Sequence, residues 1–202
     1  MALATQTILS LGASHLSVTT LSRSSGGCIL EHVLHQPLNG DPDLKGQWLE
    51  LVDHGLEQLA LKASLKAVTG VVLPSWVVLT KLLKVTRIEG DGQEEVVRFE
   101  AENAMPNGLD GYEWTYRVLK DDGFERDVLV QAVSSSFLQD LLETLSGHGI
   151  QPSRIDAMIS AQLDAFAHHY GNETGSTLLL DVGARSVSLM VASSEELPFI
   201  RT

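Results

Sequence analysis

Hydrophobic and polar residues alternate with a period of two over residues 8–21 and 28–34, which predicts short β-strands. A glycine-containing turn divides the first of these stretches into two strands, so the chain is expected to begin as a β-meander. Apolar residues then recur at three- and four-residue spacing over residues 48–63, the pattern of an amphipathic helix. Buried strands are predicted at residues 67–73 and 76–85.

The same patterns predict a strand-helix-hairpin-helix unit after residue 80. Residues 94–104 have helical spacing, and the strands 112–119 and 126–133 flank an Asp-Asp-Gly sequence that is typical of a hairpin turn. Three serines then offer N-cap groups to a helix that Gly147 or Gly149 closes.

The last part of the chain returns to the opening pattern. Residues 155–170 are predicted to be mostly helical, and residues 177–192 form a predicted hairpin, with a last strand near Phe199. Strands and helices therefore alternate along much of the chain, and an α/β (α+β) fold is expected.

An internal repeat connects the two ends of the chain. An offset of 171 residues aligns ILSLGASHLSVTTL, residues 8–21, with LLDVGARSVSLMVA, residues 179–192. The matched pairs are Leu9 with Leu180, Gly12 with Gly183, Ala13 with Ala184, and Ser17 with Ser188. Each copy is an apolar strand, a tight turn of small residues and a second strand.

Turns of this kind can bind phosphate, because glycine lets backbone N–H groups approach an anion. Asp181 ends the first strand of the second copy, where a carboxylate can bind Mg²⁺ or orient an attacking water. The alternative is that both copies are ordinary hairpins with glycine turns and no ligand. The repeat alone is consistent with both interpretations.

Composition and charge exclude several classes of protein. Of the 202 residues, 44% are hydrophobic, which is enough for a packed core. A formal charge of −12 has the wrong sign for a protein that binds the negatively charged backbone of nucleic acid. The single cysteine, Cys28, cannot form an internal disulfide, so a reducing compartment such as the cytoplasm is expected. Pairs of histidines suggest no metal site, because no third ligand has a supportive spacing.

Two stretches are rich enough in uncharged residues to suggest membrane segments, but polar or charged residues interrupt both. Residues 1–22 carry no formal charge, yet many Ser and Thr residues interrupt them and no basic residue precedes an apolar core. Residues 68–85 are broken by Pro74, Lys81 and Lys84. No direct membrane insertion is therefore expected.

The negative charge is concentrated in one segment. Residues 89–127 contain twelve acidic and four basic residues, a net charge of −8 in 39 residues. In the same segment, Trp114 and Tyr116 lie two apart on a predicted strand and therefore share one face. They are either core residues or the lining of a peptide groove, and the acidic surroundings favour a basic or apolar peptide.

Several segments resemble one family in their order and spacing. They are the opening SLGASHLSV, the strand pair LPSWVVLTKLLKV, the long stretch EEVVRFEAENAMPNGLDGYEWTYRVL, then DVLVQAVSSSFLQDLLETLSGHGIQPSRIDA and LLLDVGARSVSLMV. Together they resemble the PilM family of type IV pilus assembly proteins, relatives of the cell-division protein FtsA and of the actin-like ATPases. The resemblance covers nearly the whole chain.

The resemblance implies a particular domain organisation. A ribonuclease-H-like, actin-type subdomain is expected in two parts, residues 1–80 and 151–202. An inserted strand-helix-strand-strand subdomain, SHS2, which resembles subdomain 1C of FtsA, is expected at residues 81–150. The second lobe of the family fold is expected to be absent from this chain.

The resemblance also implies a function. It predicts a cytoplasmic scaffold, peripheral to the inner membrane, that binds the N-terminal tail of an inner-membrane pilus protein of the PilN type. Trp114 and Tyr116 are the candidate partner-binding residues. Oligomer formation stays open.

Members of the family bind ATP between two lobes, and this implies a set of candidate ligand-binding residues. For ATP in the full-length protein they are Gly12, Ala13, Ser14, Asp181, Gly183, Ala184 and Arg185, with Asp181 also the candidate Mg²⁺ ligand.

Three positions depart from the family pattern. Ser10 stands where the family has an acidic residue, Ser17 where it usually has Lys, and Arg185 where Thr is usual. A degenerate or incomplete nucleotide site, and a scaffold without enzymatic activity or cofactor in this fragment, are therefore expected. The alternatives are a working ATPase in the full-length protein, with Asp181 as its catalytic residue, and the related actin-like domain of a type II secretion system.

Overall fold

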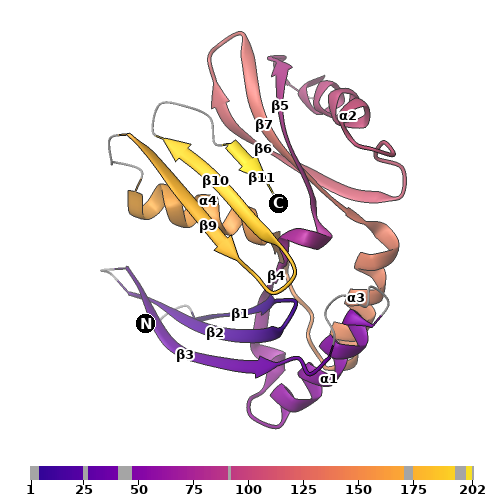
Figure 1. Ribbon diagram of the computed structural model, residues 1–202, viewed down its shortest axis with the longest axis vertical. Helices are drawn as coiled ribbons and strands as arrows, with labels where there is room; N and C mark the ends of the chain where they lie inside the picture. Colours follow the sequence, from indigo (N-terminus) through magenta and orange to yellow (C-terminus); the bar gives the residue numbers. More distant parts are fainter. Residues whose placement is uncertain are drawn as a thin grey trace. The chain divides into compact units, whose positions relative to one another are not determined.

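The computed structural model describes residues 5–24, 27–40, 47–90, 92–170, 175–193 and 199–201 (Figure 1). The chain divides into two compact units, each built from segments that are distant in the sequence. The first contains Met1–Pro74, Gln139–Asp164 and Gly183–Ser186, and the second contains Ser75–Leu138, Ala165–Val182 and Val187–Thr202. The predicted α/β class is confirmed.

The first unit contains a mixed sheet with the strand order β3-β2-β1-β4-β8. Strands β1, β2 and β3 form the predicted meander, whereas β4 pairs parallel to both β1 and β8. The bounds are Thr5–Leu11 for β1, His15–Ser24 for β2, Gly27–Pro37 for β3, Val68–Leu73 for β4 and Arg154–Ala157 for β8. A short 3₁₀ helix, Leu65–Ala67, leads into β4.

Helix α1, Trp48–Ala60, buries its apolar stripe in the core of the first unit. Val52, Leu56 and Leu59 are fully buried, as are Leu9 and Leu11 of β1. Gly55 of α1 lies so close to β2 that a Cβ atom there would come within 2.9 Å of the Leu16 Cδ1 atom. The helix therefore packs closely on one face of the meander.

The prediction of a helix from residue 155 is wrong at its start. Arg154–Ala157 form strand β8, and helix α4 occupies Met158–Tyr170. Strand β8 pairs in parallel with β4, from Gly70 with Arg154 to Leu73 with Ala157. The backbone partners of this strand lie more than eighty residues away in the sequence, so local periodicity could not reveal it.

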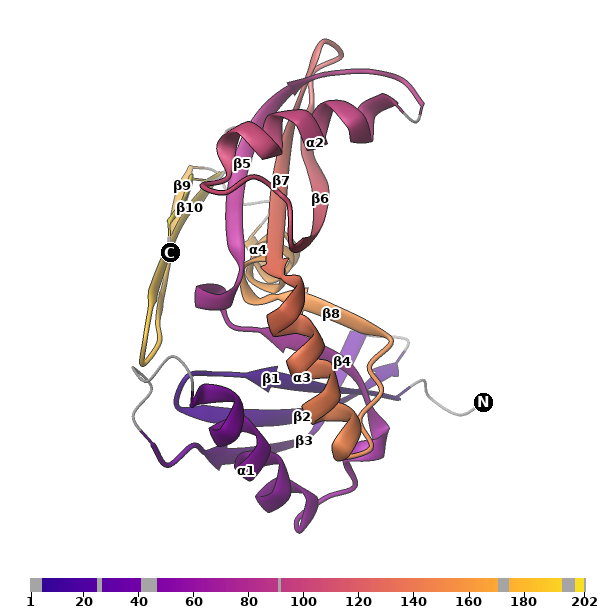
Figure 2. The same ribbon diagram turned by 90° about the vertical axis from the view of Figure 1, so that its right-hand side faces the viewer.

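In the second unit, three antiparallel strands in the order β5-β7-β6 carry one helix on one face (Figure 2). The strands are β5, Leu79–Thr86; β6, Tyr112–Asp121; and β7, Glu125–Ser134. Helix α2, Gly92–Ala104, runs alongside β5. The predicted strand at residues 76–85 begins later than expected, because a 3₁₀ turn occupies Ser75–Val77.

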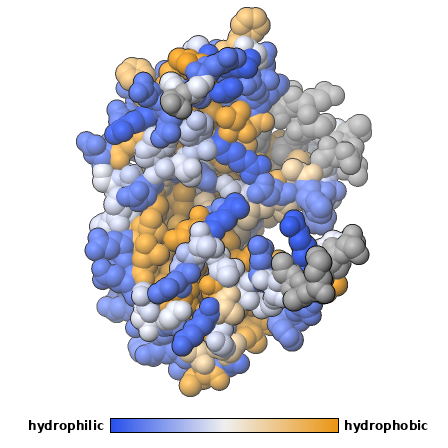
Figure 3. Space-filling model, turned by 180° about the vertical axis from the view of Figure 1, so that it is seen from behind, coloured by the Kyte–Doolittle hydropathy of each residue, from blue (hydrophilic) through white to orange (hydrophobic). Residues whose placement is uncertain are grey.

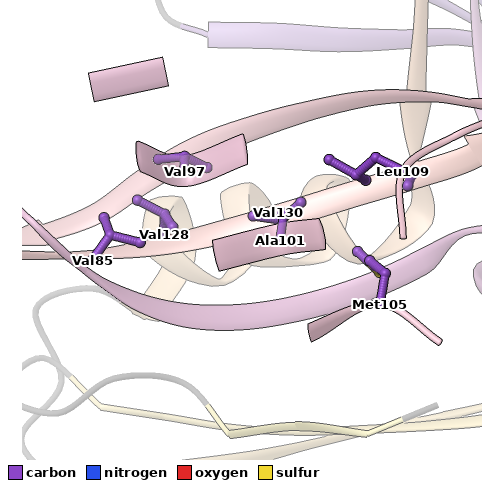
Figure 4. Packing of buried hydrophobic residues seen from close by; sticks show 8 residues of the cluster. Val85, Val97, Ala101, Met105, Leu109, Val128 and Val130 are labelled. Carbon is purple, nitrogen blue, oxygen red and sulfur yellow. The ribbon is translucent and has the colours of Figure 1, made fainter. Parts of the chain in front are cut away.

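A hydrophobic cluster fills the space between α2 and this sheet. Figure 4 shows Val97 and Ala101 of α2 near Val85 of β5 and Val128 and Val130 of β7. All five side chains are 2% exposed or less. The observed order of strand, helix, strand, strand agrees with the pattern read from the sequence, while its assignment as an SHS2 subdomain stays a prediction.

Helix α3, Ser135–Gly147, begins and ends at the predicted residues. The Ser134 Oγ atom accepts a hydrogen bond from the Phe137 N–H at 3.5 Å, as an N-cap residue does. At the other end Gly149 has a φ of +73°, and the Ile150 N–H donates to the Leu145 carbonyl oxygen at 3.0 Å. This left-handed glycine closes the helix.

A third sheet has the strand order β11-β10-β9. Its strands are β9, Ser176–Val182; β10, Val187–Ser193; and β11, Phe199–Arg201. Strands β9 and β10 form the predicted hairpin. Of the helices in the described part of the chain, none is long and apolar enough to cross a membrane.

Candidate functional site

The internal repeat is also a structural repeat. Strand β1, Thr5–Leu11, and strand β9, Ser176–Val182, coincide at both ends when 171 is added to the first set of numbers. The register across each hairpin also coincides, since Leu11 pairs with Leu16 and Val182 pairs with Val187. The two copies are therefore the same local structure, not only a similar composition.

The two turns close with the same hydrogen bond. The Gly12 N–H donates to the His15 carbonyl oxygen at 2.9 Å, and the Gly183 N–H donates to the Ser186 carbonyl oxygen at 2.9 Å. Because these two amides are used inside the turns, an anion would have to bind the amides that follow them. In the first turn these amides belong to Ala13 and Ser14. Of the three residues predicted there to bind phosphate, these two would therefore supply the backbone N–H groups.

The first turn is held in place by the rest of its unit. The Trp48 Nε1–H donates to the Gly12 carbonyl oxygen at 3.0 Å, and the Leu38 N–H donates to the Ser14 carbonyl oxygen at 2.8 Å. Trp48 is 2% exposed. No local sequence pattern connects Trp48 with this turn, although Trp48 stands at the start of the apolar stripe of residues 48–63.

The carboxylate that the resemblance predicts occurs in only one copy. Asp181 pairs across the second hairpin with Ser188, and the equivalent pair in the first hairpin is Ser10 with Ser17. Asp181, Gly183 and Ala184 are exposed, and Arg185 is partly exposed. Within the described ranges, no group of three His, Cys, Asp or Glu residues is placed to hold a metal ion.

Trp114 and Tyr116 lie on β6, an edge strand of the β5-β7-β6 sheet. Their rings are stacked, with centroids 6.3 Å apart and an interplanar angle of 23°. Both side chains are half-buried and pack against the hydrophobic cluster under α2. They therefore contribute to the core and leave part of their surface beside an open strand edge.

Ion pairs at the β6–β7 turn neutralise part of the acidic segment. The Arg126 Nε atom lies 2.8 Å from the Asp121 Oδ2 atom, and this hydrogen bond lowers the pKa of the Asp121 carboxyl. The backbone N–H groups of Glu125 and Phe124 lower the pKa of the Asp122 carboxyl. The net charge of this segment is evident from its sequence, whereas these ion pairs and hydrogen bonds depend on the turn that brings the groups together.

The chain resembles several solved structures. A chain of the "PilM-PilN type IV pilus biogenesis complex" is 25% identical, with a TM-score of 0.77, and the match covers 99% of this chain and 61% of that one. Two others show the fold: the cytoplasmic domain of EpsL, an inner-membrane component of the type II secretion system of Vibrio cholerae, and a Bacteroides thetaiotaomicron protein of unknown function with an actin-like ATPase fold. Each has a TM-score of 0.57, and each match covers 98% of this chain. The EpsL domain is 13% identical, with 71% of its chain covered, and the Bacteroides protein is 9% identical, with 69% of its chain covered.

No family model matches the sequence, and no curated protein matches it as a relative. The resemblance to PilM is nevertheless confirmed at the level of structure, and the fold is that of the actin-like ATPases. The chain spans less than two thirds of the PilM-PilN complex chain that it matches.

Proposed function

We propose that this chain is part of a cytoplasmic scaffold for type IV pilus assembly, held at the inner membrane by the N-terminal tail of a PilN-like protein. The match to a chain of the PilM-PilN complex over 99% of this sequence carries the proposal.

The exposed edge of β6 offers a site for an extended peptide. A tail that adds to this edge as a further strand would gain main-chain hydrogen bonds and could lay an apolar side chain on the stacked Trp114 and Tyr116 rings. The surrounding segment has a net charge of −8, which favours a tail that carries lysine or arginine.

Calorimetric titration of the chain with the synthetic N-terminal tail of a PilN-like protein tests this proposal. Trp114→Ala should weaken binding by about tenfold or more, because alanine removes an aromatic anchor. Phe99→Ala is the matched control, because Phe99 is an aromatic residue on α2 that is 64% exposed. Circular dichroism shows whether each variant is folded.

These titrations test the proposed scaffold function and the proposed binding site at Trp114 separately. If no tail of a PilN-like protein gives heat, the proposed function is wrong. If the tail binds folded Trp114→Ala as tightly as the unchanged protein, the function stands and the site lies elsewhere. A parallel titration with the tail of a type II secretion partner distinguishes the related secretion scaffold.

We further propose that the nucleotide site of this chain is degenerate. The first hairpin has Ser10 opposite Ser17 where the second has Asp181 opposite Ser188. An Asp or Glu carboxylate contributes a negatively charged oxygen to Mg²⁺ in many nucleotide sites, whereas Ser10 offers only a neutral hydroxyl. Of the two carboxylates that such a Mg²⁺ site would need, this chain therefore has only Asp181, and Ser10 replaces the other.

The second candidate is an ATPase in the full-length protein, and the identical closing hydrogen bond of the two turns favours it. In that case the full-length protein binds ATP in the presence of Mg²⁺, and Asp181→Ala abolishes this binding. Ser10→Asp, which restores the missing carboxylate, strengthens it. If calorimetry detects no ATP binding to the full-length protein, this candidate is excluded.

A further inference from the structure

Two histidine side chains meet beside the β1–β2 turn. His15 begins β2 and His35 lies near the end of β3, yet their ring centroids are only 6.0 Å apart, with an interplanar angle of 62°. Both residues are exposed. They are twenty residues apart in the sequence, so no local spacing indicates the pair. The antiparallel pairing of β2 with β3 brings the two rings together.

The two imidazoles lie on the face of the sheet opposite helix α1. Ser17 pairs with His35 across the strands, and His15 stands two residues before Ser17, so all three side chains share one face. Ser10 of β1 pairs with Ser17 and extends the row. The other face carries the buried Leu16, against which α1 packs. The histidines therefore border the same row of side chains as Ser10 and Ser17.

The turn holds the His15 ring in place. A Cβ atom on Gly12 would lie 3.6 Å from both the Cε1 and the Nδ1 atom of His15, an ordinary van der Waals distance, so the ring rests against the glycine. The Nδ1 atom also lies 3.3 Å from the Ser14 Oγ atom, a hydrogen-bond distance. With Nδ1 used in this way, Nε2 is the nitrogen that His15 offers to a ligand.

We propose that His15 and His35 bind a divalent transition-metal ion of the zinc type. Imidazole nitrogen suits Zn²⁺, whereas Mg²⁺ prefers the oxygens of carboxylates, phosphates and water. Zn–N bonds of about 2.0–2.1 Å place the centroids of two bound imidazoles about 5–6 Å apart. The observed 6.0 Å therefore requires only a small rotation of the rings.

The surroundings of the pair favour a transition metal over Mg²⁺. Ser10 and Ser17, in the adjoining row, bring neutral hydroxyls and no carboxylate. In the part of the chain that the structure describes, no third His, Cys, Asp or Glu completes a metal site. Water would fill the remaining positions of the ion, so binding should be weaker than at a zinc site with three or four protein ligands. The net charge of −12 favours the approach of any cation.

Other histidines supply matched controls. His32 lies on the same strand as His35 but three residues away and pairs with Thr20, so its side chain is on the opposite face of the sheet. His168 and His169 are neighbours on α4, with ring centroids 4.9 Å apart, although adjacent residues of a helix do not face each other. Hydrophilic residues occupy much of the surface in Figure 3, so exposure alone does not mark a site and the controls must be equally exposed.

Titration of the ¹⁵N-labelled chain, without a histidine tag, with ZnCl₂ tests the proposal. We expect saturable chemical-shift changes in the amides around His15 and His35, reversed by EDTA, and none at these amides with MgCl₂. His15→Ala and His35→Ala should each weaken this binding by about tenfold or more, because one imidazole is lost. His32→Ala and the double variant His168→Ala/His169→Ala should leave it unchanged.

Circular dichroism shows whether each variant is folded. If His15→Ala disturbs the turn, the comparison depends on His35→Ala, which lies outside it. Each of several results would overturn the proposal: no shifts at the pair, shifts that His35→Ala leaves unchanged, shifts confined to α4, or an equal response to Mg²⁺. The assay contains neither a PilN-like tail nor a nucleotide, so the proposed function does not depend on its result.

Discussion

At the scale of single residues, Gly12 determines the shape of the first turn. A Cβ atom at this position would lie 2.6 Å from the His15 carbonyl oxygen, closer than real Cβ contacts, whereas at Gly183 the equivalent distance to the Ser186 oxygen is 3.2 Å. The two turns share a hydrogen bond but differ in how much space they leave.

Gly12→Ala should therefore destabilise the protein by about 1–3 kcal/mol, because the backbone must move to accept the methyl group. Gly183→Ala should cost less than about 1 kcal/mol, because a shift of a few tenths of an ångström is enough. Urea unfolding followed by circular dichroism measures both. Equal losses in the two variants would contradict the argument.

Asp122 makes the β6–β7 turn sensitive to acid. Its Oδ1 atom accepts hydrogen bonds from the N–H groups of Phe124 at 2.9 Å and Glu125 at 2.7 Å, which lowers the pKa of this carboxyl. Since the folded pKa is lowered, the stabilisation is present above the unfolded value of about 4 and is lost as pH falls through the folded value.

The midpoint of urea unfolding should accordingly fall as pH is lowered below about 4. Asp122→Asn keeps an oxygen acceptor but does not titrate, so its midpoint should change less with pH, with Asp121 supplying the remaining dependence. Asp122→Ala removes the acceptor and should be less stable than Asp122→Asn at neutral pH. Identical pH profiles for Asp122→Asn and the unchanged protein would contradict this assignment.

At the scale of elements, a helix and a turn are connected by one side chain. Trp48 begins α1 and donates its indole N–H to the Gly12 carbonyl oxygen, so the helix and the β1–β2 turn hold each other in place. Neither the helical spacing nor the glycine pattern indicated this contact.

Trp48→Phe should lower the free energy of unfolding by about 1–3 kcal/mol, because it leaves the Gly12 carbonyl without this donor and removes buried surface. Amide shifts of Ala13 and Ser14 should change in the same variant. Leu61→Ala, at an exposed position after α1, should have an effect within about 0.5 kcal/mol. If Trp48→Phe is as stable as the unchanged protein and the amide chemical shifts of Ala13 and Ser14 stay the same, the hydrogen bond from Trp48 does not stabilise the turn.

Elements differ in how well local sequence predicts them. Helices α1, α2 and α3 were predicted because their buried residues recur with the helical period, and at α3 a serine and a glycine also mark the two ends. Strand β8 was not predicted, because its four residues are too few to show a period and its partner is β4. Glycine at positions 123 and 149, with φ of +92° and +73°, marked the turns correctly.

At the scale of the whole molecule, charge should control partner binding. Of the net charge of −12, −8 lies in residues 89–127, a segment that includes strand β6 and thus the proposed peptide edge. Some carboxylates of this segment are paired, as Asp121 is with Arg126, so the field at the edge is weaker than the count of charges suggests.

If the bound tail is basic, its affinity should fall several-fold between about 50 and 500 mM salt, because salt screens attraction between exposed charges. The titration with the PilN-like tail at several salt concentrations measures this dependence. An affinity independent of salt would indicate that the contact with Trp114 and Tyr116 is mainly apolar.

The sequence by itself determined the α/β class, the strand-helix-hairpin unit, the acidic segment and the repeat at offset 171. All of these follow from properties that neighbouring residues share: the period of apolar side chains, the freedom of glycine and the sum of charges. The tertiary structure decided which surfaces are buried. Two hairpins of the same register bury Leu9 and Leu11 but expose Leu180 and Val182, because burial depends on whether another element packs against the strand, and local sequence does not encode that.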